Sequence, residues 1–407
     1  SCFLNPMLRV GDALDYIIRV RKTTDQPYVV NGKAIKTDGT VVDYVDDGTE
    51  YKSVADVYKD VRFEIFICGG TFYPYKDAYG NQGESRANTF VVPEKVTIVG
   101  GVNHDGGIPD GDHLIHPYCQ EGYEEDVVRT EEMEIAGYSL EPATTLEIRT
   151  ERAHQDRNGN NVDEPWEMEE QTILSGAAVQ NDAKANIYHV ITCLVNTERV
   201  GQLPTRKDAE DKCLAPLYNA GLNPTRGELL ANLEAEAQAS RDARIIIIDG
   251  VTITGGYANK IDVNDVGANA QTLTYFRGGG ILVEGNWDAT FDTKGDLPEV
   301  LGVAKRDIPL ILTACLIKDN VAGNGGGLYS NGTIYNFGCH YTQTLAIGPI
   351  TAKDQDYIPL TAGGAIATNY QCHVWNTLFD NNEARRAPYQ IINGTVHNAD
   401  ARQGYAD

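Results

Sequence analysis

Residues 156–167 carry oxygen-bearing side chains at the spacing of a calcium-binding loop. The segment reads Asp-Arg-Asn-Gly-Asn-Asn-Val-Asp-Glu-Pro-Trp-Glu. A calcium loop takes side-chain oxygens from its positions 1, 3 and 5, a backbone carbonyl from position 7, and further oxygens from positions 9 and 12. The pattern predicts a metal site with calcium as its cofactor, and the ligands would be Asp156, Asn158, Asn160, Val162, Glu164 and Glu167.

Two residues of this segment depart from the calcium pattern. Asn161 stands where such loops have Gly, although Asn can adopt the left-handed conformation that this position needs. Pro165 disturbs the exit from the loop because it fixes its own backbone and has no N–H group. Asn and Asp side chains also bond to the backbone two residues further on. An Asx-rich turn that satisfies its own backbone without a metal is therefore the alternative.

A second cluster of metal-binding residue types precedes this loop. Two of its histidines are three residues apart and could share a helix face, which would suit zinc or another transition metal. The glycines and the proline among them favour a loop instead, so a solvated acidic loop is the alternative. The cluster consists of His104, Asp105, Asp110, Asp112, His113 and His116.

The charge of the chain excludes one class of partner. Its 407 residues include 34 Lys and Arg against 58 Asp and Glu, a net charge of -24. A surface this acidic repels phosphate, so no nucleic-acid partner is expected. Hydrophobic residues make up 42% of the chain, which is enough for a large core. No apolar run reaches the roughly 18 residues that a membrane-spanning helix needs.

Eight cysteines occur without a CxxC pair or a zinc-like spacing. Most lie in apolar runs, which predicts small buried side chains in a core. A disulfide between Cys119 and Cys213, both in polar segments, is the alternative for that pair. Cys2 is a candidate lipid anchor of a bacterial lipoprotein, and the alternative is that the chain starts inside a longer polypeptide.

An internal repeat indicates which elements must position these residues. Glycine-rich triplets recur at 278–280, 325–327 and 363–365, and Cys315 lies 24 residues before Cys339. Short β-rich runs alternate with these turns and not with helices, so βαβ units are excluded. Such runs can stack as coils of a parallel β-solenoid, with Gly at the corners and Asn bonded to its copy in the next coil. A β-propeller is the rival, but it needs hairpin turns.

The chain divides into a short N-terminal part and one long repeat. Residues 1–60 are predicted to hold a capping helix, with Leu8, Leu14 and Ile17 on one face, and a polar lead-in. Residues 61–407 are the predicted parallel β-helix, with 389–396 as its last coil. Two insertions interrupt it, an acidic loop at 103–170 and a helical segment at 198–243, and these are the expected partner contacts.

Several segments together resemble surface and secreted right-handed parallel β-helix proteins of Bacteroidota, which have the pectin-lyase-like fold. The resemblance implies an all-β, right-handed parallel β-helix with an N-terminal capping helix, located outside the cell or on the outer-membrane surface. It implies little about activity, since many relatives are adhesins or structural proteins. The matching segments are 67–74, 96–103, 172–176, 188–192 and 249–256.

The resemblance requires a test for glycan-cleaving activity. Hydrolases of this shape resemble one another in an Asn-Thr-Asp, Asp-Asp and Gly-His-Gly set. Only Asn196-Thr197-Glu198 partly matches, Asp46-Asp47 precedes the repeat, and Gly-His-Gly does not occur. Lyases need a basic residue beside a calcium cluster, and no acidic set accompanies the candidate arginines. We therefore expect no catalytic residues and a non-enzymatic role in adhesion or as a structural subunit of a surface assembly.

The alternative is a carbohydrate-active β-helix, either a polysaccharide lyase, a glycoside hydrolase or a glycan-binding protein. The expected partners are accordingly other cell-surface proteins or host and environmental glycans. Tyrosines at strand ends would suit sugar stacking if they lay beside carboxylates, but they also edge solenoids for structural reasons. These are Tyr73, Tyr75, Tyr79, Tyr257, Tyr275, Tyr329 and Tyr335.

Overall fold

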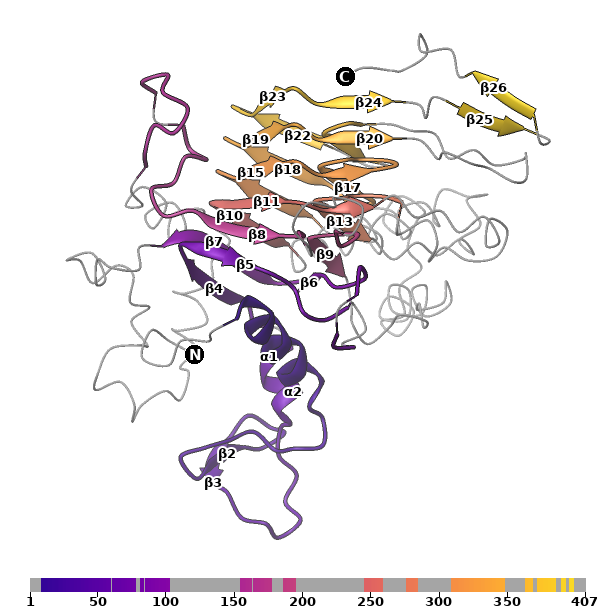
Figure 1. The fold of residues 1–407 in the computed structure, drawn as a ribbon. Helices are drawn as coiled ribbons and strands as arrows, with labels where there is room; N and C mark the ends of the chain where they lie inside the picture. The colour runs from indigo at the N-terminus through magenta and orange to yellow at the C-terminus, as the bar shows by residue number, and fades with distance from the viewer. Residues whose placement is uncertain are drawn as a thin grey trace, which may run out of the picture.

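Most described strands belong to four parallel sheets, and within each sheet the strands lie one above another in chain order (Figure 1). The coordinates are a computed structural model. They describe residues 9–59, 61–77, 81–83, 85–102, 154–162, 164–177, 186–194, 245–258, 276–284, 309–347, 363–368, 372–385, 389–392 and 395–398. The predicted all-β class with a parallel arrangement agrees with this architecture.

The first and second sheets have six strands each. The first contains β4 (Phe63–Cys68), β7 (Val96–Val102), β10 (Ile246–Asp249), β14 (Leu310–Thr313), β18 (Ile334–Phe337) and β22 (Cys372–Trp375). The second contains β5 (Gly70–Phe72), β8 (Thr172–Ser175), β11 (Val251–Thr254), β15 (Leu316–Lys318), β19 (His340–Thr342) and β23 (Leu378–Asp380).

The third sheet has four strands and the fourth has five. The third contains β12 (Tyr257–Ala258), β16 (Val321–Ala322), β20 (Leu345–Ile347) and β24 (Glu383–Arg385). The fourth contains β6 (Phe90–Pro93), β9 (Ile191–Leu194), β13 (Ile281–Glu284), β17 (Leu328–Ser330) and β21 (Ile366–Thr368).

Consecutive strands belong to different sheets, and the chain returns to each sheet one layer higher. From β14 it passes through β15, β16 and β17 before β18 pairs in parallel with β14. We call one such round a coil. Leu310 pairs with Ile334, and Leu316 pairs with His340, so this coil takes 24 residues, the spacing between Cys315 and Cys339. This succession is compatible with the predicted solenoid.

The pairing register places apolar side chains in columns inside the coils. Ile98, Ile248 and Leu312 occupy one column in three successive layers of the first sheet, and all three are fully buried. Burial of each such side chain stabilises the fold by about 1.5–3 kcal/mol. Cys315 and Cys339 are likewise buried, as predicted. Cys372 is an exception and is exposed, because β22 pairs only with β18 among the described strands.

The corners between strands use left-handed backbone at equivalent positions. Between the first and second sheets these residues are Ala314, Gly338 and Asn376, with φ of 51°, 57° and 47°. Glycine is thus one of several residues at this corner. It is needed at Gly326, where an added Cβ would stand 2.5 Å from the Gly364 carbonyl oxygen and 2.6 Å from that of Leu345. The triplets therefore allow close approach between coils.

Asparagine at another corner bonds to the neighbouring coil, but not in the predicted way. Asn320 is fully buried, donates to the Ile253 carbonyl at 2.9 Å and accepts the Gly256 N–H at 2.9 Å. Its partners are backbone groups of the coil below, so the predicted bond between Asn copies is wrong here. Asn382 accepts instead from the hydroxyl of Thr344, at 2.7 Å. The backbone groups give both the N–H and the oxygen of the buried Asn320 amide a hydrogen-bond partner. A second Asn in the next coil would not necessarily do so.

The predicted N-terminal helix is confirmed as α1 (Val10–Lys22). Its buried face, which includes Leu14 and Ile17, packs into the same core as the first coil, and Figure 1 shows it at that end of the stack. Next come three short antiparallel strands, β1 (Val29–Val30), β2 (Lys33–Ile35) and β3 (Val41–Asp43), and then α2 (Val54–Tyr58), which begins at a capping box of Ser53 and Asp56. The sequence predicted only a polar lead-in for this stretch.

Residues 389–396 were predicted to form the last coil, and this prediction is wrong. β25 (Tyr389–Ile392) and β26 (Thr395–Asn398) pair with each other in antiparallel fashion. Asn393-Gly394 stands between them, and this dipeptide is a strong hairpin signal. The insertion at 198–243, residues 103–153 of the other insertion, and Cys2, Cys119 and Cys213 all lie outside the described residues.

We predict that Gly326→Ala destabilises the protein by about 3 kcal/mol, the upper end of the cost of overpacking, because backbone atoms of two neighbouring segments oppose the new methyl group. Gly338→Ala is the matched control. Ala314 already occupies the equivalent corner with a similar φ, and a Cβ on Gly338 would meet only the Pro165 side chain, at 3.2 Å, so we expect a loss of about 1 kcal/mol. Urea unfolding measures both, and equal losses would contradict the close-approach argument.

A second prediction concerns His189, which is buried and whose Nδ1 atom lies 2.9 Å from the Gly278 carbonyl oxygen. Burial lowers the pKa of His189 to about 4, whereas the unfolded chain has the ordinary value of about 6.5. Between these values only the unfolded state binds the proton, so stability falls as the pH drops from about 6.5 towards 4. In His189→Gln the slope of unfolding free energy against pH should be lower by about 1.4 kcal/mol per unit. Identical slopes in wild type and variant would refute the claim that His189 causes this pH dependence.

Candidate functional site

The predicted calcium segment forms a closed loop. Its ends are joined by an antiparallel bridge between His154 and Met168 and by a hydrogen bond of 2.9 Å from Gln155 N–H to the Glu167 carbonyl. Asn161 has a φ of 61°, the left-handed conformation that its position requires. The loop therefore has the closed ends and the left-handed turn that a calcium loop needs. An Asx-rich turn without a metal has the same two features, so they do not distinguish the two interpretations.

Side-chain oxygens shape the first half of the loop. Asp156 accepts the backbone N–H groups of Gly159 and Asn160 through Oδ1, at 2.7 and 3.1 Å, and that of Asn161 through Oδ2, at 2.7 Å. Asn158 Oδ1 accepts the N–H of Asn160 at 2.9 Å. These bonds fold the backbone around the side chains, as the Asx-turn alternative predicted.

Two glutamates close the second half of the loop. Asn158 and Asn160 donate their amide N–H groups to Glu164, at 3.2 and 2.5 Å. Burial raises the pKa of Glu167, and the neighbouring carboxyl of Glu164 raises it further. The neighbouring Glu167 carboxyl is the largest cause that lowers the pKa of Glu164, and the hydrogen bond from Asn160 is the next. The two carboxyl groups are thus close enough to share a proton or a cation.

The loop lies against the outside of the coils at one corner. The position of a Cβ on Gly338 would be 3.2 Å from the ring of Pro165, and the Trp166 ring lies 5.1 Å from that of His340. His340 Nε2 is 2.5 Å from Asp380 Oδ1. Burial raises the pKa of Asp380, but hydrogen bonds from His340 and Thr342 outweigh this and lower it overall. Pro165 and Trp166 therefore connect the loop to the last two coils.

An aromatic stack continues on the outward face of the same two coils. Tyr335 stacks on His373 with ring centres 4.9 Å apart, and Phe337 stacks on Trp375 at 4.6 Å with planes 5° apart. The ring spacing equals the spacing of adjacent strands, so the rings face each other along the stacking direction. The upper faces of His373 and Trp375 are directed towards a layer above β22.

The last coil also exposes side chains that earlier coils bury. Val374 lies above Asn336 and Phe379 lies above Tyr341, and both lower residues are fully buried. Val374 is 42% exposed and Phe379 is 43% exposed. We call Cys372, Val374, Trp375, Leu378 and Phe379 the end surface. It combines apolar side chains with the upper edges of β22 and β23, where sheet pairing ends.

The other predicted residues contribute less to a common site. The cluster at 104–116 and the segment at 196–198 lie outside the described residues. Tyr329 is buried, and the hydroxyl of Tyr75 donates to Asp12 and Asp15, which ties the chain after β5 to α1. Both therefore have structural roles. Within the described ranges, no three His, Cys, Asp or Glu side chains converge as metal ligands, a count that leaves out amide and carbonyl oxygens.

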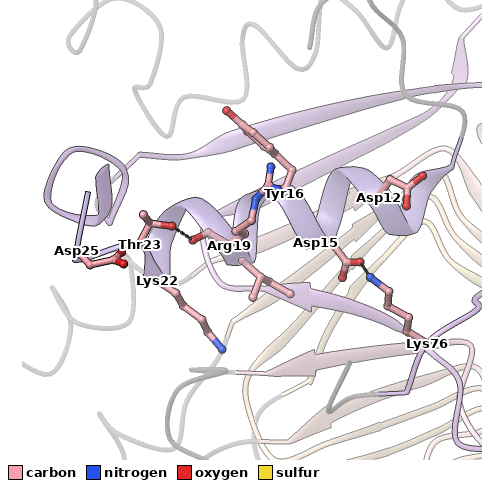
Figure 2. Close-up of a pocket in the computed structure, with 9 residues that line it drawn as sticks. Asp12, Asp15, Tyr16, Arg19, Lys22, Thr23, Asp25 and Lys76 are labelled. Carbon is pink, nitrogen blue, oxygen red and sulfur yellow. Dashed lines mark hydrogen bonds and ion pairs between the residues drawn. The ribbon is translucent and has the colours of Figure 1, made fainter. Parts of the chain in front are cut away.

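An open pocket runs along the exposed side of α1, at the opposite end of the stack from the end surface (Figure 2). Its charged side chains are partly paired, since Lys76 forms an ion pair with Asp15. The Thr23 hydroxyl donates to the Arg19 carbonyl at 2.9 Å and so closes the helix end. These contacts anchor α1, and they assemble no nucleophile, base and acid in the pattern of a catalytic site.

Comparison with known proteins found no match to a family model, to a curated protein or to a solved structure. Among the described residues, the helices are too short and too polar to cross a membrane.

The end surface and the aromatic stack were not identified from the sequence, apart from Tyr335. In β18, Tyr335 and Phe337 alternate with the buried Ile334 and Asn336, which is the signal of an outward face, whereas β22 contains no buried residue. The alternation alone does not reveal that Phe337 and Trp375 stand one above the other. That juxtaposition follows from the register of β18 and β22.

We predict that Trp166→Ala releases the loop from the coils. Arg157 donates to the carbonyls of Met168 and Glu169, at 3.0 and 2.7 Å, and a docked loop protects its peptide bond from trypsin. Cleavage after Arg157 should accelerate severalfold in Trp166→Ala. Trp375→Ala, which removes an exposed Trp from the neighbouring stack, should leave the rate unchanged. Equal protection in Trp166→Ala would show that the ring does not hold the loop.

Proposed function

We propose that the four parallel sheets are the faces of a right-handed parallel β-helix with α1 as its N-terminal cap. The passage from β14 through β17 to β18, one layer higher, supports this architecture. Right-handedness is expected, since parallel strands connected within one sheet almost always cross over in that sense. The apolar face of α1, which packs on the first coil, supports the capping role.

We further propose that the protein acts outside the cell or on the outer-membrane surface of a bacterium, as a non-enzymatic structural subunit or adhesin. The location rests on the resemblance of its sequence motifs. The subunit role rests on one observation, the end surface, where no described strand covers the last coil and about two-fifths of Val374 and of Phe379 is exposed to solvent. A strand edge with apolar neighbours is a template for pairing with another chain.

A second copy of the same protein is the occupant that we propose for the end surface. α1 covers the other end, so copies cannot stack head to tail, and two end surfaces would meet across a two-fold axis. The last coil also carries charged side chains of both signs, since Glu383 pairs with Arg385 on β24. A patch with both signs can complement itself when it is rotated by a half-turn.

The alternative function, a carbohydrate-active or glycan-binding β-helix, is favoured by the aromatic stack. Sugar rings pack on aromatic faces, and the upper faces of His373 and Trp375 are the ones that the stack leaves uncovered. A glycan would then occupy the layer in which the first proposal places a second copy. The two functions therefore compete for one surface and can be separated by experiment.

The subunit proposal predicts that the protein self-associates and that Cys372 becomes protected as it does. We expect light scattering to show a dimer that Phe379→Lys dissociates, because a charge in the apolar interface costs several kcal/mol. Val30→Lys, on a similarly exposed strand position of β1, should leave the dimer intact. Alkylation of Cys372, read by mass spectrometry, should slow as concentration rises, while buried Cys339 stays unreactive throughout.

A monomer with fully reactive Cys372 at every concentration would contradict the subunit proposal. A polysaccharide panel then tests the alternative. Binding that Trp375→Ala abolishes would support a glycan-binding protein, and new reducing ends or unsaturated products would establish an enzyme.

A further inference from the structure

The buried carboxylate of Glu167 is the starting observation, and it is independent of the proposed assembly. Glu167 is only 5% exposed. Its Oε1 atom accepts the backbone N–H groups of Arg157 and Asn158, at 3.3 and 3.1 Å. Its Oε2 atom is buried and has no hydrogen-bond partner. A buried oxygen of this kind costs about 1–3 kcal/mol, and more when it is charged, so it needs a ligand.

The groups around Glu167 are oxygen-rich and negatively charged. Glu164 lies within hydrogen-bonding reach of it, and both Asn158 and Asn160 contact Glu164. Arg157 is the only Lys or Arg in the twelve residues, and its guanidinium is directed to the carbonyls of Met168 and Glu169. The carboxylates of the loop therefore lie close together, and the Arg157 guanidinium does not pair with them.

We propose that residues 156–167 bind a calcium ion through the oxygens of Asp156, Asn158, Asn160, Val162, Glu164 and Glu167. Carboxylate, amide and carbonyl oxygens are the ligands that calcium prefers, and calcium accepts the irregular geometry of a loop. The uncoordinated Oε2 of Glu167 gains a partner when the ion binds. The amides of Asn158 and Asn160 turn their oxygens to the ion as Glu164 releases their N–H groups.

Calcium in this loop would also affect the outside of the coils. Pro165 and Trp166 lie between the ligands Glu164 and Glu167, and they are the residues that contact Gly338 and His340. An ion bound on both sides of this pair restricts the backbone that carries them. Calcium therefore fixes the contact between the loop and the last two coils.

Terbium luminescence tests the site, because Tb³⁺ replaces Ca²⁺ among oxygen ligands and Trp166 is adjacent to the ligand Glu167. We expect sensitised terbium emission in the wild type, and we expect added calcium to suppress it. Calorimetry with calcium alone should give one site per chain. Glu167→Gln should weaken binding by at least about tenfold, since even changes outside the ligand set can cost that much.

Three further variants separate the site from its neighbours. Glu169→Gln changes an exposed carboxylate just outside the loop and should bind calcium as the wild type does. Trp166→Phe should lose the sensitised emission and keep the calorimetric affinity. Glu164→Gln tests a ligand whose side chain is less buried than that of Glu167, so its weakened binding would be interpretable even if Glu167→Gln distorts the loop.

The proposal fails if the wild type gives neither heat with calcium nor sensitised emission. It also fails if Glu164→Gln and Glu167→Gln both bind as tightly as Glu169→Gln, because the ion would then lie elsewhere. In either case the loop is the Asx-rich turn.

Discussion

Parallel backbone pairing in register between successive coils is the constraint on which the rest of this structure depends. A shift of one residue would exchange the inner and outer faces of a strand, so the register must hold along the first sheet, and it does from β7 to β22. Because it holds, Ile98, Ile248 and Leu312 form one buried column. The same register places Tyr335 under His373 on the outside.

The close spacing of the coils decides which residues the corners accept. At Gly326 a side chain would meet carbonyl oxygens of two neighbouring segments, so only Gly is compatible with that spacing. At Ala314, Gly338 and Asn376 the requirement is only a left-handed backbone, which residues other than Gly can adopt at a modest cost. Glycine is therefore used for two different physical reasons in the same coils.

In a stack of coils, each interior coil is covered on both sides by its neighbours. The first and last coils each have one side that no neighbouring coil covers. At the first coil α1 supplies the missing layer with the apolar face that includes Leu14 and Ile17. At the last coil the inward side chains Val374 and Phe379 have no layer above them within the part of the chain that the structure describes. The loop at 154–168 docks beside that end through Trp166. The two candidate binding regions, the end surface and the loop, therefore both lie near the last coil.

The repeats, the capping helix and the closed loop at 156–167 follow from the sequence, because strand alternation, helical periodicity and Asx spacing are local patterns. The helical spacing of Leu14 and Ile17 is sufficient to predict α1, and Asn393-Gly394 is a local signal for the antiparallel pair of β25 and β26. Only the tertiary structure brought Trp166 to His340, exposed Cys372 and left Glu167 Oε2 buried without a donor. The physical reason is that contacts between coils depend on register and on insertions of variable length, which local patterns do not encode.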